Sequence, residues 1–377
     1  MSRRVIAHAL PWGNVGGTEL ATLRLAEALR AGGYANRMLV PHLPGAQDVA
    51  DLMRDHGFPV SRYHQVAPRK ANPLPFFANG ARLAAGFLRD GVGLVHGADI
   101  AGAYFTAWAA RLSGARVTSH VRCAHPALAE VERWLLKPVE RFAFVSRATI
   151  GQQDFPCAPE RAEVLYDAAR PPQPVPVAAA RAHYGLDPEA VVFGMAARIH
   201  PQKDHESLIR AAARVKADHP GLRFLMVGDT TGEAVHRDQF ARLEALMRET
   251  GTRDLFVFPG FEGEMARFYA AIDVCLLASH TEGFPLGILE AMGAGLPVVA
   301  SDVGGVSEAV EAGVTGFLAA DRDVDAFAAA IGQLAGDGGL RTRMGAAGRQ
   351  RAETRFGPER FAREACAFAA RMIGPPQ

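Results

Sequence analysis

Cysteine is scarce in this chain, which has four cysteines among 377 residues, far apart and without a C-x-x-C pair. Such spacing predicts neither a disulfide framework nor a structural zinc site, and it is typical of a reducing compartment. The sequence also lacks an apolar run of about 18 residues, the length that a membrane-spanning helix requires. The apolar run near the start is too short for a signal peptide, so we expect a cytoplasmic protein.

A large charge of one sign is also absent, because 41 Lys and Arg balance 40 Asp and Glu. This balance gives no reason to expect a nucleic-acid partner. The charges are unevenly placed: residues 1–170 hold 20 cations and 14 acids, and residues 171–377 hold 21 and 26. The basic first half favours an anionic substrate or a membrane surface, although chance placement on two solvated faces explains the counts equally well.

About half of the residues are hydrophobic, and 377 residues exceed what one core usually serves, so we expect two globular domains. Short apolar runs alternate with segments of helical period, which predicts βαβ units and parallel sheets. The predicted strands are RVIAHAL, RMLV, GLVHG, ARVTSHV and RFAFVS in the first half, and AVVFGMAAR, LRFLMVGD, LFVFPG, VCLLAS and GLPVVAS in the second half.

A proline-rich segment, ARPPQPVPVAAA at residues 169–180, separates these two runs of elements. We interpret it as the interdomain linker, which predicts domains at residues 1–168 and 169–357. The chain ends in a predicted helix, and we expect residues 358–377 to cross back to the first domain. The predicted fold class is α/β with two doubly wound parallel sheets, which bind ligands at the carboxyl ends of their strands.

The most informative stretch is TEGFPLGILEAMGAGLP, at residues 281–297, which follows the predicted strand VCLLAS. Its loop therefore leaves the carboxyl end of a buried strand. Pro285 at the first helical position favours a helix that runs to about Ala294. Glu282 precedes this helix. Glu290 lies five residues after Pro285, which is roughly 7–8 Å along the helix axis at 1.5 Å per residue.

The first amides of this helix, at Phe284, Leu286 and Gly287, are predicted to bind a phosphate or sugar oxygens. The two glutamates then flank an anion site, a layout that suits a nucleotide-sugar. The alternative is a solvated loop acid at Glu282 and a surface helix acid at Glu290. The surrounding glycines and proline favour the site.

Two cations and two glycines follow other predicted strands. Arg198 and Lys203 precede a predicted helix and can stabilise the charge of a departing diphosphate, although two ordinary surface cations give the same pattern. Gly16 and Gly17 follow the first strand, where glycine allows a ligand to approach the backbone closely. A nicotinamide dinucleotide is disfavoured, because GNVGGT does not fit G-x-G-x-x-G and no acid ends the second strand.

Taken in order, these motifs resemble the retaining family-four glycosyltransferases, the group 1 enzymes of the E-x7-E type with the GT-B fold. The segments GNVGGTELATLRLAEALRAGGY, FGMAARIHPQKDHESLIRAAARV and EGFPLGILE carry the resemblance, which covers nearly the whole chain. It implies two Rossmann-like domains facing each other across a cleft. It also implies catalysis without a metal or cofactor, the nucleotide-sugar being a substrate.

The resemblance also implies a role for each candidate in the second domain. Glu290 would bind the ribose hydroxyls of the donor. Glu282 and the backbone from Gly283 through Phe284 and Pro285 to Leu286 would hold the donor sugar. Arg198 and Lys203 would clamp the diphosphate.

In the first domain, His120 ends a predicted strand, and the resemblance places it in the cleft beside the transferred sugar. A core or solvated histidine is the alternative. Asp167 stands where the family usually has an asparagine–glycine pair, which weakens any donor-side role for that segment.

Two further segments have competing interpretations. The run DRDVD at residues 321–325 invites a manganese site, but its position after GFLA favours a helix cap. The segment VERWLLKPVERF combines Trp134 with basic residues, as a helix lying on a membrane does, and a buried amphipathic helix has the same pattern.

We therefore expect an enzyme of polysaccharide biosynthesis that transfers a hexose from a UDP donor, or less commonly a GDP donor. The acceptor would be a glycan, a lipid-linked glycan or a small molecule, with possible peripheral contact to the inner membrane face. The alternatives are a nucleotide-sugar epimerase or phosphorylase of the same fold, a glycosidase with two carboxylates, and a non-catalytic nucleotide-sugar binding protein.

Overall fold

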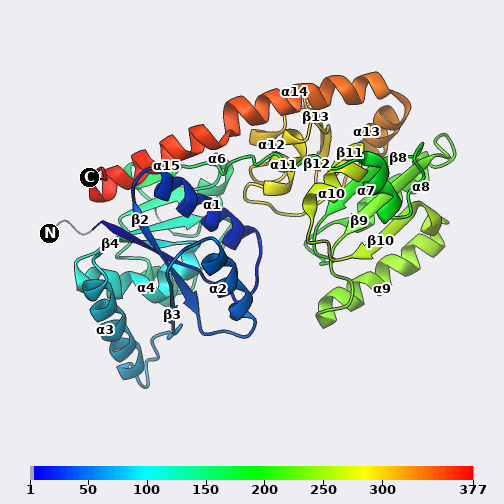
Figure 1. Ribbon diagram of the computed structural model, residues 1–377. Helices are drawn as coiled ribbons and strands as arrows, with labels where there is room; N and C mark the ends of the chain where they lie inside the picture. The colour runs from blue at the N-terminus through cyan, green and yellow to red at the C-terminus, as the bar shows by residue number, and fades with distance from the viewer. Residues whose placement is uncertain (1–3, 156, 377) are drawn as a thin grey trace. The chain divides into compact units, whose positions relative to one another are not determined.

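The computed structural model describes residues 4–155 and 157–376 (Figure 1). The chain divides into two compact units. The first unit comprises Met1–Ala168 and Pro358–Gln377, and the second comprises Ala169–Gly357. Each unit contains one parallel β-sheet with helices on its faces.

The first unit has a seven-stranded parallel sheet with the strand order β3-β2-β1-β4-β5-β6-β7. The order reverses between β1 and β4, so the carboxyl ends of these two strands mark the topological switch point of the sheet. The strands are β1 (Val5–Ala9), β2 (Ala35–Pro41), β3 (Val60–Tyr63), β4 (Val92–Gly97), β5 (Arg116–Val121), β6 (Arg141–Phe144) and β7 (Ala162–Val164).

Side chains of this sheet alternate between two helical layers, as the two-residue period of a strand requires. Ile6 and Leu94 pack in a cluster with α1 and α15, whereas Ala7 and Val95 pack in a cluster with α4. The helices are α1 (Gly17–Ala31), α2 (Ala46–Asp55), α3 (Leu74–Arg89), α4 (Ile100–Ser113), α5 (Glu130–Leu135), α6 (Arg147–Ile150) and α15 (Pro358–Ile373), with a 3₁₀ turn at Pro159–Arg161.

The last helix, α15, belongs to the first unit and lies beside α1 (Figure 1). Its buried residues recur at helical spacing and form one apolar stripe, namely Phe361, Ala365, Phe368, Ala369 and Met372. This stripe packs with residues of α1 against the same face of the sheet.

The second unit has a six-stranded parallel sheet with the order β10-β9-β8-β11-β12-β13, which reverses between β8 and β11. The strands are β8 (Val191–Ala196), β9 (Leu222–Val227), β10 (Phe256–Gly260), β11 (Val274–Leu277), β12 (Val298–Ser301) and β13 (Gly316–Ala319). The helices are α7 (Val177–His183), α8 (His205–Val215), α9 (Ala234–Glu249), α10 (Met265–Ala271), α11 (Leu286–Gly293), α12 (Val306–Ala309), α13 (Val324–Gly336) and α14 (Gly338–Phe356), with a 3₁₀ turn at Arg253–Leu255.

Among the described residues, no helix is both long and apolar enough to cross a membrane.

Candidate functional site

The switch point of the second sheet gathers the predicted donor-site residues. Arg198 and Lys203 lie in the loop after β8, and Glu282 lies in the loop after β11, the neighbouring strand. Because both strands are parallel, the two loops leave the same edge of the sheet. Ligands of open parallel sheets bind at this place.

Lys203 and Glu282, 79 residues apart in the sequence, form an ion pair. Their side chains are only 17% and 12% exposed, so water screens the pair little. The predicted cation of the diphosphate clamp and the predicted sugar-binding acid are therefore adjacent. Arg198, at the other end of the loop after β8, is exposed.

Backbone hydrogen bonds fix the two loops to each other. The Asp204 amide donates to the Ala278 carbonyl at 3.0 Å, and the His280 amide donates to the Gln202 carbonyl at 3.0 Å. The Asp204 side chain accepts from the Ser207 amide at 3.1 Å and caps α8. This framework fixes the backbone on both sides of Lys203.

The helix after the second loop begins one residue later than expected. Pro285 is the N-cap of α11 and not its first helical residue, because its extended ψ of 113° lies outside the helical range. The helix starts at Leu286 and ends at Gly293. Leu286 and Gly287 therefore occupy its first turn, where amides have no partner within the helix.

The loop before α11 is locked from the other side by the chain after β12. Gly305 donates its amide to the Gly283 carbonyl at 3.0 Å. Gly304 has a φ of +55°, and a Cβ there would lie 1.8 Å from the Glu282 carbonyl oxygen. Glycine is thus required at 304 both for its backbone angle and for the close approach of the Glu282 loop.

Glu290 is oriented by a residue that the sequence did not reveal. Tyr269, on α10, donates its hydroxyl to Glu290 Oε2 at 3.0 Å and to the Gly287 carbonyl at 3.2 Å. One phenol thus ties the predicted ribose-binding acid to the first turn of α11. Phe284, in contrast, is 6% exposed and packs against Phe356, so only its backbone is available to a ligand.

The predicted glycines of the first unit lie at the start of α1. Gly16 is the N-cap, and Gly17, the first helical residue, is exposed, so a Cβ added there would meet no other atom within 4 Å. Neither glycine has a positive φ among the described residues, so backbone strain does not explain them. Glu19, which the sequence analysis overlooked, accepts from the Gly16 amide at 3.2 Å. Burial raises the pKa of Glu19 to about 7.

The expectation that His120 faces a cleft is wrong. Its side chain is 0% exposed and lies among residues of α1 and α15, such as Leu25 and Phe368. The reason is strand alternation, which places position 120 on the covered face of the sheet. His120 joins His8 and His96, whose Nδ1 atoms are 3.1 Å apart, in a buried cluster. Burial lowers the pKa of His120 well below its usual value and keeps the ring neutral.

Asp167 is part of a buried ion pair within the first unit. Its Oδ2 accepts from Arg122 Nη1 at 2.7 Å, and both side chains are less than 10% exposed. A second nitrogen of Arg122 lies 3.3 Å from His120 Nδ1. The pair provides a structural role for the residue that departs from the family pattern.

The acidic run at residues 321–325 caps a helix, as the sequence predicted. Asp323 Oδ1 accepts from the Ala326 amide at 2.9 Å at the start of α13. Asp321 pairs with His280, and Asp325 pairs with Arg214. The three carboxylates thus contact three different partners.

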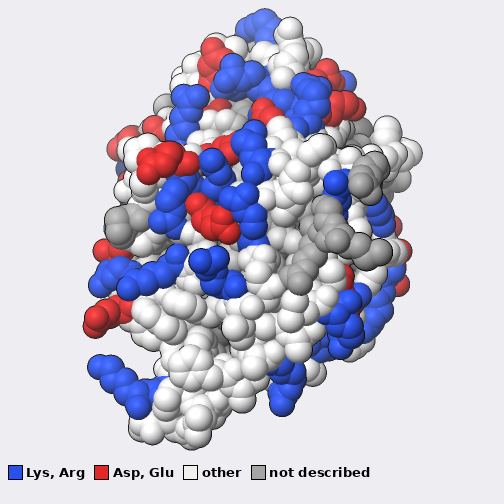
Figure 2. Space-filling model, turned by 90° about the vertical axis from the view of Figure 1, so that its left-hand side faces the viewer, with Lys and Arg blue, Asp and Glu red and all other residues white. Residues whose placement is uncertain are grey.

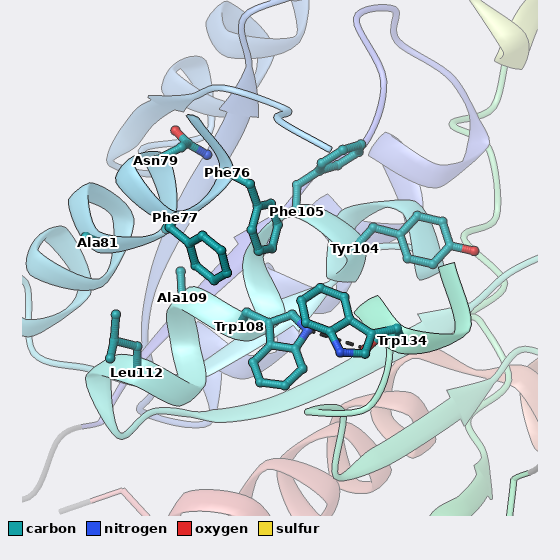
Figure 3. Close-up of a pocket in the computed structure, with 11 residues that line it drawn as sticks. Phe76, Phe77, Asn79, Ala81, Tyr104, Phe105, Trp108, Ala109, Leu112 and Trp134 are labelled. Carbon is teal, nitrogen blue, oxygen red and sulfur yellow. Dashed lines mark hydrogen bonds between the residues drawn. The ribbon is translucent and has the colours of Figure 1, made fainter. Parts of the chain in front are cut away.

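The first unit contains an aromatic pocket of about 210 Å³ between α3, α4 and α5 (Figure 3). Trp134, predicted to lie on a membrane or in a buried amphipathic helix, is half-buried and stacks on Trp108 with ring centroids 4.6 Å apart. It therefore forms a wall of this pocket. Phe77 and Leu112, which also line the pocket, are 60% and 68% exposed.

Two family models match the chain. The model described as Glycosyltransferase Family 4 matches residues 15–168, and the model described as Glycosyl transferases group 1 matches residues 177–351. D-inositol 3-phosphate glycosyltransferases of Kribbella flavida and Nocardia farcinica are 39% and 38% identical over 47% and 45% of this chain. These alignments span 42% and 38% of the relatives' own lengths, about two fifths.

Solved structures of similar fold cover nearly the whole length. HepE of Anabaena in complex with UDP has a TM-score of 0.82 at 22% identity, over 98% of this chain and 100% of that chain. Sucrose-phosphate synthase of Thermosynechococcus elongatus has a TM-score of 0.76 at 21% identity, over 98% and 99%. These similarities confirm the predicted GT-B fold with its two parallel-sheet α/β domains.

Proposed function

Because the chain belongs to family 4 of the glycosyltransferases, we propose that it transfers a sugar from a nucleoside diphosphate donor to an acceptor hydroxyl, with retention at the anomeric carbon. The observation that supports this most strongly is the meeting of Lys203, Glu282 and the start of α11 at the switch point of the second sheet. A sugar diphosphate presents negative charge and hydroxyl groups together, and this edge offers cations, amides and carboxylates together.

In the proposed reaction, the bond between the anomeric carbon and the diphosphate oxygen breaks, and a bond forms between that carbon and the acceptor oxygen. The departing diphosphate takes the acceptor proton on the same face. Arg198 and Lys203 stabilise the charge that gathers on the diphosphate, a role for which positioned cations suffice without a metal. Glu290 holds the ribose diol, and Glu282 holds sugar hydroxyls while keeping Lys203 in position.

The proposed donor is a UDP-sugar. Support comes from HepE of Anabaena, which was solved with UDP and with UDP-glucose. HepE is 22–23% identical to this chain, and the panel of nucleotide-sugars described below identifies the base and the sugar.

The proposed acceptor carries an apolar part, and the first unit binds it. Support comes from the aromatic pocket with its exposed rim, whose two tryptophan rings and phenylalanines offer an apolar surface (Figure 3). Figure 2 shows a face on which Lys and Arg side chains, with Asp and Glu among them, lie next to a largely uncharged zone.

The test is turnover with a panel of nucleotide-sugars, each with a lipid-linked acceptor, with its water-soluble head group alone, and without acceptor. We expect acceptor-dependent release of a nucleoside diphosphate and a product that keeps the donor's anomeric configuration. Donor isomerisation without release would show an epimerase, and binding without turnover would show a non-catalytic module. Equal rates with and without the lipid tail would remove the proposed role of the aromatic pocket.

A second assay, with chelator-treated protein, tests whether the transfer reaction requires a metal ion. We expect the same rate before and after treatment, because Arg198 and Lys203 supply the positive charge. A rate that vanishes with chelator and returns with manganese would overturn this part of the proposal.

A further inference from the structure

Three side chains of different chemistry converge at the carboxyl edge of the first sheet. Asp99 follows β4 and caps α4, whereas Cys123 and His125 follow β5, the neighbouring strand. Cys123 Sγ lies 3.4 Å from His125 Nε2 and 3.5 Å from Asp99 Oδ2, and His125 Nε2 lies 3.3 Å from Asp99 Oδ1. One ligand atom of each residue lies within 4.8 Å of a ligand atom of each of the other two.

The separations of these three groups are close to those between ligand atoms of one zinc ion. Zinc binds sulfur at about 2.3 Å and nitrogen or oxygen at about 2.0–2.2 Å, so tetrahedral angles separate such ligand atoms by roughly 3.3–3.6 Å. A thiolate, an imidazole and a carboxylate are the three ligand types that zinc prefers. We propose that Asp99, Cys123 and His125 form a zinc-binding site with an open fourth position.

The surrounding backbone already holds these ligands in place. The His125 amide donates to the Gln152 carbonyl at 3.2 Å, and the Asp154 amide donates to the His125 carbonyl at 2.8 Å. Gln153 Nε2 donates to the Cys123 carbonyl at 3.2 Å. The Asp99 side chain accepts from the Ile100 amide at 2.8 Å. Zinc binding therefore requires little reordering of the chain.

The charge and exposure of the cluster suit an exchangeable ion. A thiolate and a carboxylate together neutralise the two charges of zinc. Arg122, the nearest cation in sequence, is already paired with Asp167. Asp99 is 4% exposed, but the His125 side chain is 20% exposed and Cys123 is exposed, so the fourth position is open to water or to an oxygen of a ligand.

A second cluster, Asp204, His280 and Asp321, is less suited to a metal. Both carboxylate oxygens of Asp204 accept hydrogen bonds from Ser207, and Asp321 is paired with His280 at 2.6 Å. That cluster also lacks a thiol. The cluster of the first unit is therefore the better zinc site both in its ligand types and in the spacing of its ligand atoms.

The test uses full-length, chelator-treated protein titrated with Co²⁺ and then with Zn²⁺. We expect one Co²⁺ per chain, with a near-ultraviolet band of thiolate-to-cobalt charge transfer that Zn²⁺ abolishes. The band should disappear in Cys123→Ser, and His125→Ala should weaken metal binding by more than about 100-fold, while Cys157→Ser, at another free cysteine, should behave as the parent does.

Asp99→Asn keeps the acceptor that caps α4 and removes only the charge, so it should fold normally and bind zinc more weakly. Circular dichroism and UDP affinity should be unchanged in all four variants, because the cluster belongs to the first unit and the proposed diphosphate and ribose contacts belong to the second. Absence of the band in the parent protein, or an unchanged band in Cys123→Ser, would overturn the assignment.

Discussion

The Tyr269–Glu290 contact permits a prediction with a defined magnitude. If Glu290 binds the ribose diol, Glu290→Ala removes two hydrogen bonds to a charged group, each contributing about 1.5–3 kcal/mol. The sum is about 3–6 kcal/mol, so at 1.4 kcal/mol per tenfold we expect UDP to bind at least about 100-fold more weakly. Tyr269→Phe removes only the hydroxyl that donates to Glu290 Oε2 at 3.0 Å, and should weaken UDP binding about tenfold.

The two changes should not add, because Tyr269 acts on the donor through Glu290. In the Glu290→Ala background, Tyr269→Phe should change UDP affinity by less than about twofold when measured by isothermal titration calorimetry. Tyr184→Phe is the matched control, since Tyr184 donates to Glu262 Oε2 at 2.7 Å elsewhere in the second unit. If Tyr269→Phe weakened UDP binding equally in the parent protein and in Glu290→Ala, Tyr269 would not act through Glu290. If Tyr184→Phe weakened UDP binding as much as Tyr269→Phe does, the effect would not be specific to the Tyr269 hydroxyl.

Four further outcomes are expected. Arg198→Ala should lower kcat roughly 100-fold in the transfer assay, and normal turnover would remove Arg198 from the diphosphate clamp. Gly304→Ala, which places a Cβ 1.8 Å from the Glu282 carbonyl oxygen, should abolish donor binding while circular dichroism shows the fold retained; unaltered UDP affinity would contradict the loop account. Burial raises the pKa of Glu19 from 4.5 to about 7, so the free energy of unfolding should fall by up to about 3 kcal/mol as pH rises from about 4.5 to 7. Urea unfolding measures this fall, and Glu19→Gln should flatten it. An unchanged pH dependence in Glu19→Gln would contradict the assignment to Glu19. Burial lowers the pKa of His8 from 6.5 to about 4, so the stability that the neutral His8 ring contributes should be lost as pH falls from 6.5 towards 4. A His8→Asn variant whose free energy of unfolding depends on pH as that of the parent does would rule out this role of His8.

Much of the fold was predictable because its central strands are continuous apolar runs bounded by turn residues. Strands β8 and β11 are of this kind. Helix α14 was not recognised, because its glycine-rich sequence has low helix propensity and its stability comes from packing against α11 and the chain before β12. Helix α3 was also not predicted, and proline and aromatic residues stand in its first turn.

The candidate site was predictable where it depends on strand ends and not where it depends on side-chain direction. Lys203 and Glu282 follow adjacent strands, so their proximity follows from topology. His120 also ends a strand, but strand periodicity defines two faces without saying which one the helices cover. Tyr269 and Asp99 were missed because each meets its partners through the fold, 21 and 24 residues away, at spacings that match no motif.

The most direct test of the account is a crystal structure of the full chain with UDP. We predict the uracil nucleotide at the carboxyl edge of the second sheet, with the diphosphate against Arg198, Lys203 and the first amides of α11, and with the ribose hydroxyls on Glu290. Nucleotide bound elsewhere, or bound at this edge with its ribose away from Glu290, would contradict the proposed donor site.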